Sequence, residues 1–262
     1  TDISGFSQEI RIASAVENSN FGWIVGAFYS GIDTAVSVDD IGFYNAGNLI
    51  LDFGSVDFSV SSESIALFAN IDYQISSRLK FTAGLRYFED DRSFEQSPIK
   101  ENGTFDHVSP MMSFNYAIGD DASIYLRVAE GFRSGGFNPG APVETDFDPE
   151  TVRAYELGTK VMLLDSKMSL DASVFYSEYK DYQGNDRVSV DGSSGTLFSA
   201  TTNPGAADIV GLEWSSTYNI SDRYSLGFSG HYIDTEFVKV SDTFNAYNVG
   251  DPIDNVPKYS IS

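Results

Sequence analysis

Three stretches of the chain share one pattern: Ile75-Ser-Ser-Arg-Leu-Lys-Phe-Thr-Ala-Gly-Leu-Arg-Tyr87, Leu164-Asp-Ser-Lys-Met-Ser-Leu-Asp-Ala-Ser-Val-Phe-Tyr176 and Ile220-Ser-Asp-Arg-Tyr-Ser-Leu-Gly-Phe-Ser-Gly-His-Tyr232. Each has a polar turn, a basic residue, an alternating strand and a Tyr nine positions after the basic residue. Nine strand residues rise roughly 30 Å, or about 23 Å along the normal when the strand tilts by about 40°. The apolar band of an outer-membrane barrel is about as tall, at roughly 25 Å, and is bordered by aromatic residues. The pattern therefore predicts membrane-spanning strands, with Tyr87, Tyr176 and Tyr232 as anchors at the outer interface.

Alternation of apolar and polar residues continues along most of the chain. About ten such strands and one partial strand can be counted. Tight turns alternate with long connections rich in Gly, Pro, Ser and Asp, which predicts an all-β, antiparallel up-and-down transmembrane β-barrel wall. The expected tight turns lie near residues 76, 120, 165 and 221, and the expected long connections are 31–62, 88–106, 133–150, 181–207 and 236–255.

Charged residues on these strands fall on the face opposite the apolar stripe. Arg86, Glu156, Glu213 and His231 belong to this polar face. Charges are costly against lipid but tolerated inside a barrel, so this face is expected to line the lumen. There the four side chains either contact whatever fills the lumen or belong to polar networks within the wall.

The composition excludes several functions. The formal net charge of −22 argues against nucleic acid as a partner, because binding phosphates needs clustered Lys and Arg. The chain has no cysteine, which excludes disulfides and thiolate metal sites. It also lacks a nucleophile elbow, a phosphate-binding glycine loop and a zinc-binding His pair, so neither an enzyme activity nor a cofactor is expected. No signal peptide opens the chain, and we expect residues 1–262 to be one barrel domain cut from a longer protein.

Two neighbouring segments carry a resemblance to a known family: Glu130-Gly-Phe-Arg-Ser-Gly-Gly-Phe-Asn-Pro139 and Phe147-Asp-Pro-Glu-Thr-Val-Arg-Ala-Tyr-Glu-Leu-Gly-Thr-Lys160. They resemble the TonB-dependent outer-membrane receptors, in which a Gly-Phe-Arg-like strand end precedes a loop and a Tyr-Glu-Leu-Gly strand. Further similar segments occur in the family's order. These are residues 6–12, 66–87, 108–110 and 202–213.

The resemblance implies a 22-stranded barrel filled by an N-terminal plug. Such a receptor lies in the outer membrane of a Gram-negative bacterium, in contact with its lipid. It imports a scarce nutrient, most commonly a ferric siderophore, using energy relayed by the TonB complex. The chain shows neither the plug nor the closing strands, so any contact with TonB would run through a plug that these residues lack. In that setting Arg86, Glu156, Glu213 and His231 are candidate plug contacts.

Candidate ligand-binding residues lie in the long connections. Arg133 ends the Gly-Phe-Arg signature and offers a planar fork of donors to an anion, unless it pairs with Glu156 on the next strand. Aromatic side chains suit siderophores and sugars alike, but they also pack loops together. The candidates are Phe43, Tyr44, Phe137, Phe147, Tyr182, Phe198, Phe244 and Tyr247.

Metal binding has weak support in the sequence. The acidic run Glu144, Asp146, Asp148 and Glu150 offers oxygen ligands for Ca²⁺, but a solvated loop is the commoner explanation. The two histidines, His107 and His231, stand on distant strands and make a poor metal site. We therefore expect no metal site.

Several alternatives remain open from the sequence. A passive porin would share the barrel without a plug, and a barrel hydrolase would need a catalytic Ser, His and acid at its rim. A soluble β-sandwich is the most distant alternative. The acidic connections suit a neutral, cationic or sugar ligand better than an anionic chelate, so a carbohydrate or cobalamin receptor is also considered.

Overall fold

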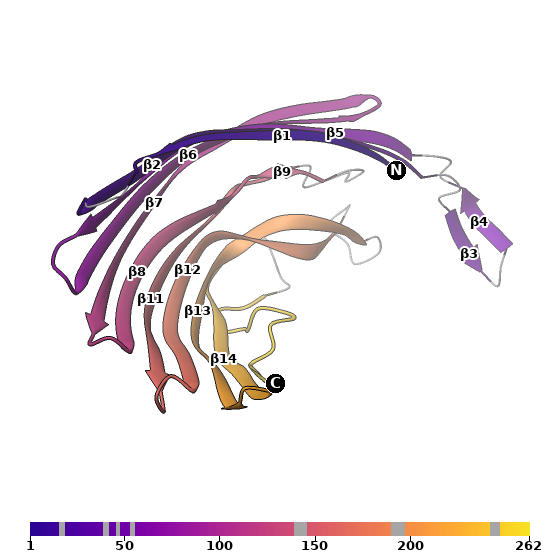
Figure 1. Cartoon of the computed structure of the whole chain (residues 1–262). Helices are drawn as coiled ribbons and strands as arrows, with labels where there is room; N and C mark the ends of the chain where they lie inside the picture. Colours follow the sequence, from indigo (N-terminus) through magenta and orange to yellow (C-terminus); the bar gives the residue numbers. More distant parts are fainter. Residues whose placement is uncertain are drawn as a thin grey trace.

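In the computed structural model, the chain forms one curved antiparallel sheet (Figure 1). The structure describes residues 1–15, 19–38, 42–45, 48–52, 56–138, 146–189, 197–241 and 247–262, and the side chains of 38–56 and 187–198 are outside this description. Eleven strands follow one another in sequence order through the sheet. They are β1 (Asp2–Ala13), β2 (Phe21–Val38), β5 (Val56–Gln74), β6 (Leu79–Gln96), β7 (Ile99–Ile118), β8 (Ala122–Arg133), β11 (Glu150–Leu163), β12 (Met168–Ser189), β13 (Leu197–Ser221), β14 (Tyr224–Val240) and β15 (Tyr259–Ile261).

Two short hairpins stand outside this sheet. One pairs β3 (Gly42–Asn45) with β4 (Asn48–Asp52), and the other pairs β9 (Gly136–Phe137) with β10 (Asp146–Phe147). The main sheet is open, with β1 and β15 as its edges. The all-β, up-and-down architecture predicted from the alternation is therefore confirmed. Within the described residues there is no helix long and apolar enough to cross a membrane.

The expected tight turns are confirmed. The Ile75 amide donates to the Leu79 carbonyl over 2.9 Å, which closes the turn between β5 and β6. Leu164 and Asp165 have φ of 56° and 52°, so the β11–β12 turn uses left-handed backbone. Gly119, with φ of 69°, does the same between β7 and β8, where glycine carries little conformational cost.

Three of the expected long connections are wrong in their extent. Residues 88–106 form the outer part of the β6–β7 hairpin, in which Gln96 pairs with Ile99. Residues 31–38 and 56–62 of the first connection, and most of 181–207, also continue as paired strand. In 88–96 and 181–189 both faces of the extension carry polar residues, so the alternation typical of a strand weakens while the backbone ladder runs on past the membrane-length segment.

The two faces of the sheet differ sharply. One face carries large apolar side chains that remain exposed, such as Leu85 at 54% and Leu126 at 48%. The other face carries Arg92 and Phe94, which contact the β9 segment. Because β9 lies on the concave side of the sheet (Figure 1), the polar face is concave and the apolar face convex. A contiguous exposed apolar face of this kind marks a membrane-facing surface.

The three tyrosines of the repeated pattern follow the tilt of the strands. Tyr176 lies in one cross-strand row with Ala83, which is four residues before Tyr87 and four strands away. The same row continues to Asp234, two residues after Tyr232 and two strands further on. The stagger is one residue per strand, which corresponds to a strand tilt of about 36° in a closed barrel. The three side chains therefore lie at one level of the wall.

Candidate functional site

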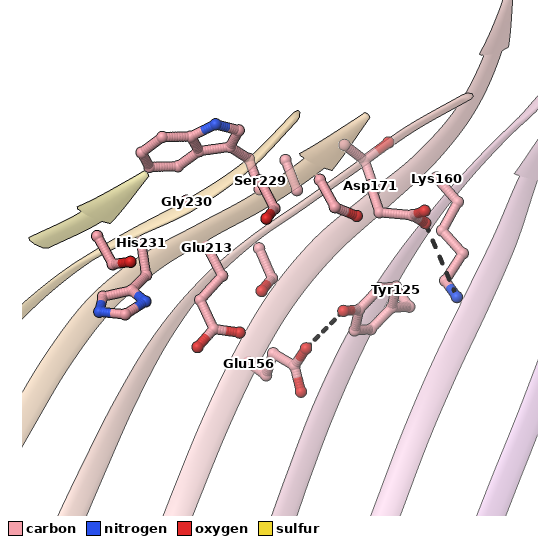
Figure 2. A pocket seen from close by; sticks show the side chains of 14 residues that line it. Tyr125, Glu156, Lys160, Asp171, Glu213, Ser229, Gly230 and His231 are labelled. Atoms are coloured by element: carbon pink, nitrogen blue, oxygen red, sulfur yellow. Dashed lines mark hydrogen bonds and ion pairs between the residues drawn. The ribbon is translucent and has the colours of Figure 1, made fainter. Parts of the chain in front are cut away.

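The concave face carries a shallow polar hollow of about 410 Å³. Figure 2 shows the side chains of Glu156, Glu213 and His231 extending to the same side of the sheet. Glu213 and His231 are direct cross-strand partners on β13 and β14. Glu213 forms no ion pair with any described residue, and the buried Nε2 of His231 has no hydrogen-bond partner there. The placement of these three residues on the concave face agrees with the sequence prediction.

Cross-strand glycines keep this face flat. A Cβ atom at Gly158 would lie 2.4 Å from the Tyr125 ring, and one at Gly211 would lie 2.3 Å from the Phe175 ring. Both aromatic rings therefore lie over the glycine of the neighbouring strand. This position lets the Tyr125 hydroxyl donate to Glu156 over 2.5 Å (Figure 2). Each ring lies flat against the wall and covers the backbone of the facing glycine, so it does not project into the lumen.

Arg86 belongs to another part of the same face. Its guanidinium stands 5.6 Å from the centre of the Phe88 ring and 6.0 Å from that of Phe28. The side chain is exposed, so its charge is held against aromatic rings and remains available to a partner in the lumen. Near the turns, Lys160 and Asp171 form an ion pair of 3.8 Å (Figure 2).

Arg133 lies at the outer end of the wall. It is opposite Glu150 on β11, and its Nη1 is 4.0 Å from the Glu150 Oε1. The pairing considered with Glu156 is therefore wrong, because Glu156 lies six residues further along β11 and accepts from Tyr125. The Arg133 side chain is 64% exposed, whereas Glu150 is buried. The buried Glu150 carboxylate thus pairs with the exposed Arg133 guanidinium at the outer end of the wall, here called the outer mouth.

Beside this pair, loop aromatics form a small core. Phe237 is 1% exposed and lies edge-on to Tyr182 at 5.6 Å between ring centres. Tyr247 packs on Phe237 at 4.7 Å. Burial is the main cause that raises the pKa of the Tyr182 phenol, with the nearby Glu150 carboxylate adding to it. Two predicted ligand aromatics, Tyr182 and Tyr247, are therefore partly buried against Phe237, and Tyr182 lies near Arg133 and Glu150.

Of the other predicted aromatics, two pack a connection against the wall and the rest lie outside what the structure describes. Phe137 and Phe147 belong to the β9–β10 pair, and the Phe137 ring stacks on Phe94 of β6 at 6.3 Å. Both are partly buried and serve mainly to pack the loop against the wall. The side chains of Phe43, Tyr44 and Phe198, and the whole of Phe244, lie outside the described residues.

The three tyrosines of the repeated pattern have carboxylate or cation partners. Tyr87 donates to Glu89 over 2.5 Å, and Tyr176 donates to Asp208 over 2.6 Å. The Tyr232 ring lies 5.5 Å from the Lys258 ammonium. The Tyr87 and Tyr176 rings are therefore apolar on their bodies and hydrogen-bonded at their hydroxyls, a combination that suits a membrane interface, while the Tyr232 ring carries a cation over its face.

Metal-binding groups are not assembled in the part of the chain that the structure describes, where no three His, Asp or Glu side chains are placed to hold an ion. Glu144, one of the acidic residues considered for Ca²⁺, lies outside the described residues. Glu150 of the same run is instead bound by the Gln183 amide over 2.6 Å.

Sequence reasoning missed the polar side chains that hold the outer connections. Arg92, Gln183 and Asn203 each bond to backbone atoms of residues 134–150. They fell in regions expected to be solvated loops. The one available signal was the position of Asn203 inside the family-like segment 202–213.

Comparisons with known proteins agree with this geometry. The pesticin receptor of Yersinia pestis is 27% identical over 210 residues, which are 76% of this chain and 29% of that protein. Among solved structures, the ferric yersiniabactin uptake receptor FyuA from Yersinia pestis has a TM-score of 0.77 at 22% identity, over 99% of this chain and 39% of that one. The siderophore receptor PiuA from Acinetobacter baumannii has a TM-score of 0.74 at 21% identity, over 99% and 43% of the two chains.

The chain spans well under half the length of these relatives. The two solved structures share its fold. A family model described as TonB dependent receptor-like, beta-barrel, matches residues 4–262. The chain therefore belongs to the β-barrel family of TonB-dependent receptors, which are proteins of the Gram-negative outer membrane and not enzymes.

Proposed function

We propose that this chain forms part of the wall of a receptor for TonB-energised uptake of a scarce nutrient, most commonly a ferric siderophore. The observation that carries the proposal is the family match over residues 4–262, with a pesticin receptor and ferric siderophore receptors among the similar proteins. The convex apolar face and the level row of tyrosines support a position within lipid, with Tyr87, Tyr176 and Tyr232 at the outer interface.

We further propose that the hollow on the concave face receives the plug. Glu156, Glu213 and His231 project from the concave face of β11, β13 and β14, and Glu213 has no ionic partner among the described residues. A carboxylate on a lumen wall favours a basic partner. Arg86, exposed over two rings, offers the opposite charge elsewhere on the same face.

The outer mouth is the proposed ligand entrance. Arg133 is exposed, its charge reaches Tyr182, and Tyr182 and Tyr247 both pack on Phe237, a combination that suits an anionic, ring-bearing chelate. Phe137 and Phe147 instead hold the connection between β8 and β11, with Phe137 stacked on Phe94 of β6. The chain as a whole is acidic, but the exposed charge at this site is the cation of Arg133. The site is therefore expected to prefer an anionic ligand.

The test is uptake of radioactive iron by the intact receptor in cells that lack other receptors, across a panel of ferric siderophores. We expect uptake that requires TonB and that falls roughly tenfold for Arg133→Gln, the loss of about 1.4 kcal/mol of ligand binding. Arg223→Gln, at a tight turn on the opposite end of the wall, is the matched control and is expected to keep full uptake.

Two outcomes would replace the proposal. Uptake of sugars by diffusion without TonB would identify a passive porin. Competition of uptake by cobalamin or an oligosaccharide, with no response to any iron chelate, would identify a receptor for that ligand.

A further inference from the structure

We propose that residues 134–138 and 146–149, here called the strap, are a fixed tie that joins two separate parts of the outer wall, and that Arg92 and Asn203 are the positioning residues that hold it. The strap lies on the concave side (Figure 1), where β9 forms part of it. The tie makes the outer ends of strands on either side of β8 move as one body.

Backbone pairing between β7 and β8 stops before the outer ends of these strands, where side chains still touch, as in the His107 ring stacked on Phe132 at 5.0 Å. Their pairing ends at Met111 and Ala129. β7 continues outward in its pairing with β6 as far as Ile99, and β8 continues in its pairing with β11 as far as Arg133. Backbone hydrogen bonds therefore do not join the two parts beyond this level in the described residues. Any mechanical connection there must run through side chains or through the strap.

One end of the strap is fastened to β6. Arg92 donates from Nη1 to the Gly135 carbonyl over 2.9 Å and from Nε to Asp90 over 2.7 Å. Asp90 is 1% exposed and also accepts from Ser62 of β5 over 2.6 Å. The guanidinium is thus oriented by a buried carboxylate, which leaves its second donor aimed at the strap.

The glycines of the strap allow this close approach. A Cβ atom at Gly135 would lie 2.5 Å from the Phe147 carbonyl oxygen and 2.6 Å from the ring of Phe105 on β7. At Gly136 it would lie 2.8 Å from the Phe147 ring. The strap therefore fits against β7 and against its own second half only where side chains are absent.

The other end of the strap is fastened to β12 and β13. Asn203 accepts from the Asp148 amide over 2.7 Å and donates to the carbonyls of Asp148 and Asp181 over 3.0 and 2.7 Å. Gln183, which is 7% exposed, donates to the carbonyls of Ser134 and Asp148, each over 2.9 Å. These side-chain amides satisfy strap backbone groups: without Asn203 the Asp148 amide loses this acceptor, and without Gln183 the Ser134 carbonyl loses this donor, whereas the Asp148 carbonyl accepts from both.

A second contact closes the same junction. Asn138 donates to the Thr201 carbonyl and accepts from the Thr201 amide, both over 2.8 Å. The strap is thus bound to β6 on one side and to β12 and β13 on the other, across β8 and β11. A displacement of either side is transmitted through hydrogen-bonded backbone, which gives a physical connection between the outer connections.

The experiment measures the distance between the two parts in the intact receptor in lipid. Spin labels at Asn102→Cys on β7 and Lys239→Cys on β14 report it, since both positions are exposed; residues 1–262 contain no cysteine, and any cysteine elsewhere in the receptor is first replaced by serine. Wild type is expected to give one narrow distance distribution. Asn203→Leu, which removes three hydrogen bonds at similar volume, and Arg92→Met are each expected to broaden it roughly twofold.

Matched controls are Asn219→Leu and Arg223→Met at a tight turn on the opposite end, which are expected to leave the width unchanged. Arg92→Lys separates positioning from simple charge balance, because lysine keeps a cation beside Asp90 but cannot bond Asp90 and Gly135 in the same fork. The proposal expects broadening with Arg92→Lys as well. A width equal to wild type for Arg92→Lys, or for Asn203→Leu in a receptor that folds normally, would overturn it.

If Asn203→Leu fails to fold, Asn138→Ala tests the same junction. Hydrogen exchange then provides the readout. Faster exchange at the Thr201 amide together with the strap amides supports a fixed tie, and faster exchange confined to Thr201 contradicts it.

Discussion

The membrane-level wall and the outer block differ in which side chains they bury. The outer block consists of the outer ends of the strands, the strap and the small core around Phe237. In the wall, the backbone is paired strand to strand, and large apolar side chains such as Leu126 stay exposed on the convex face. In the block, polar side chains such as Asp90 and Gln183 are buried and bond to neighbouring side chains and backbone. The wall therefore depends on lipid as its solvent, whereas the block has its own small core and can hold its shape in water.

The largest effect is expected in the core of the block. Phe237→Ala removes a ring that is 1% exposed and packed against Tyr182 and Tyr247. A truncation of this kind costs about 3–5 kcal/mol. Hydrogen exchange of the intact receptor is expected to show lost protection at the outer ends of β12, β13 and β14, with the membrane-level wall unchanged.

Phe228→Ala is the matched control, because Phe228 is 57% exposed on the convex face of the same strand. It is expected to leave protection of the block unchanged. Equal loss from both substitutions would show that block and wall unfold as one unit.

The next effect tests the wall. Leu126→Arg places a charge on the convex face about halfway down the wall and is expected to cost about 2–4 kcal/mol of folding free energy in a bilayer. Ser215→Arg, at a similar level on the concave face and opposite Asp171, is the control and is expected to cost far less. Folding titrations in urea with lipid vesicles measure both. Equal costs would mean that the concave face is not a lumen.

These two regions also show what the sequence could reveal. The alternation around Leu126 and the spacing of Tyr176 from Lys167 depend only on strand geometry and membrane thickness, so the wall was predictable. The contacts of Arg92 and Asn203 depend on loops that meet across many strands. No local period encodes such long-range contacts, so those residues were missed.

The Gly–Tyr packing of the concave face gives a smaller effect. Gly158→Ala puts a Cβ atom 2.4 Å from the Tyr125 ring and forces that ring off the wall, at a cost of about 1–3 kcal/mol. Gly227→Ala is the matched control, since nothing lies within 4 Å of its Cβ position on β14. Unfolding in lipid measures the difference. A Tyr125→Ala background should remove the cost of Gly158→Ala, and a cost that persists would contradict the packing explanation.

The smallest effect concerns the buried Glu150 carboxylate of the block. Burial raises its pKa, and the opposing bonds from the Gln183 amide and Arg133 do not fully offset this. The folded block therefore keeps the proton at pH values where the unfolded chain has lost it. Its stability is greatest below the ordinary carboxyl value of 4.5 and falls as the pH rises from there toward the raised pKa.

Glu150→Gln removes this titration while keeping an acceptor for the Gln183 amide. Arg133 loses its partner, but its guanidinium is 64% exposed and stays hydrated, and the 4.0 Å contact with Glu150 is long, so this loss costs little. The variant block is therefore expected to gain stability relative to wild type as the pH rises through that interval, by less than the effect of Gly158→Ala. Hydrogen exchange corrected for intrinsic rates measures it, with the exposed Glu236→Gln as control. Stability curves that run parallel with pH for wild type and Glu150→Gln would contradict this explanation. They would show that the Glu150 carboxylate is not desolvated and that the outer block is as open to water as the concave face of the wall.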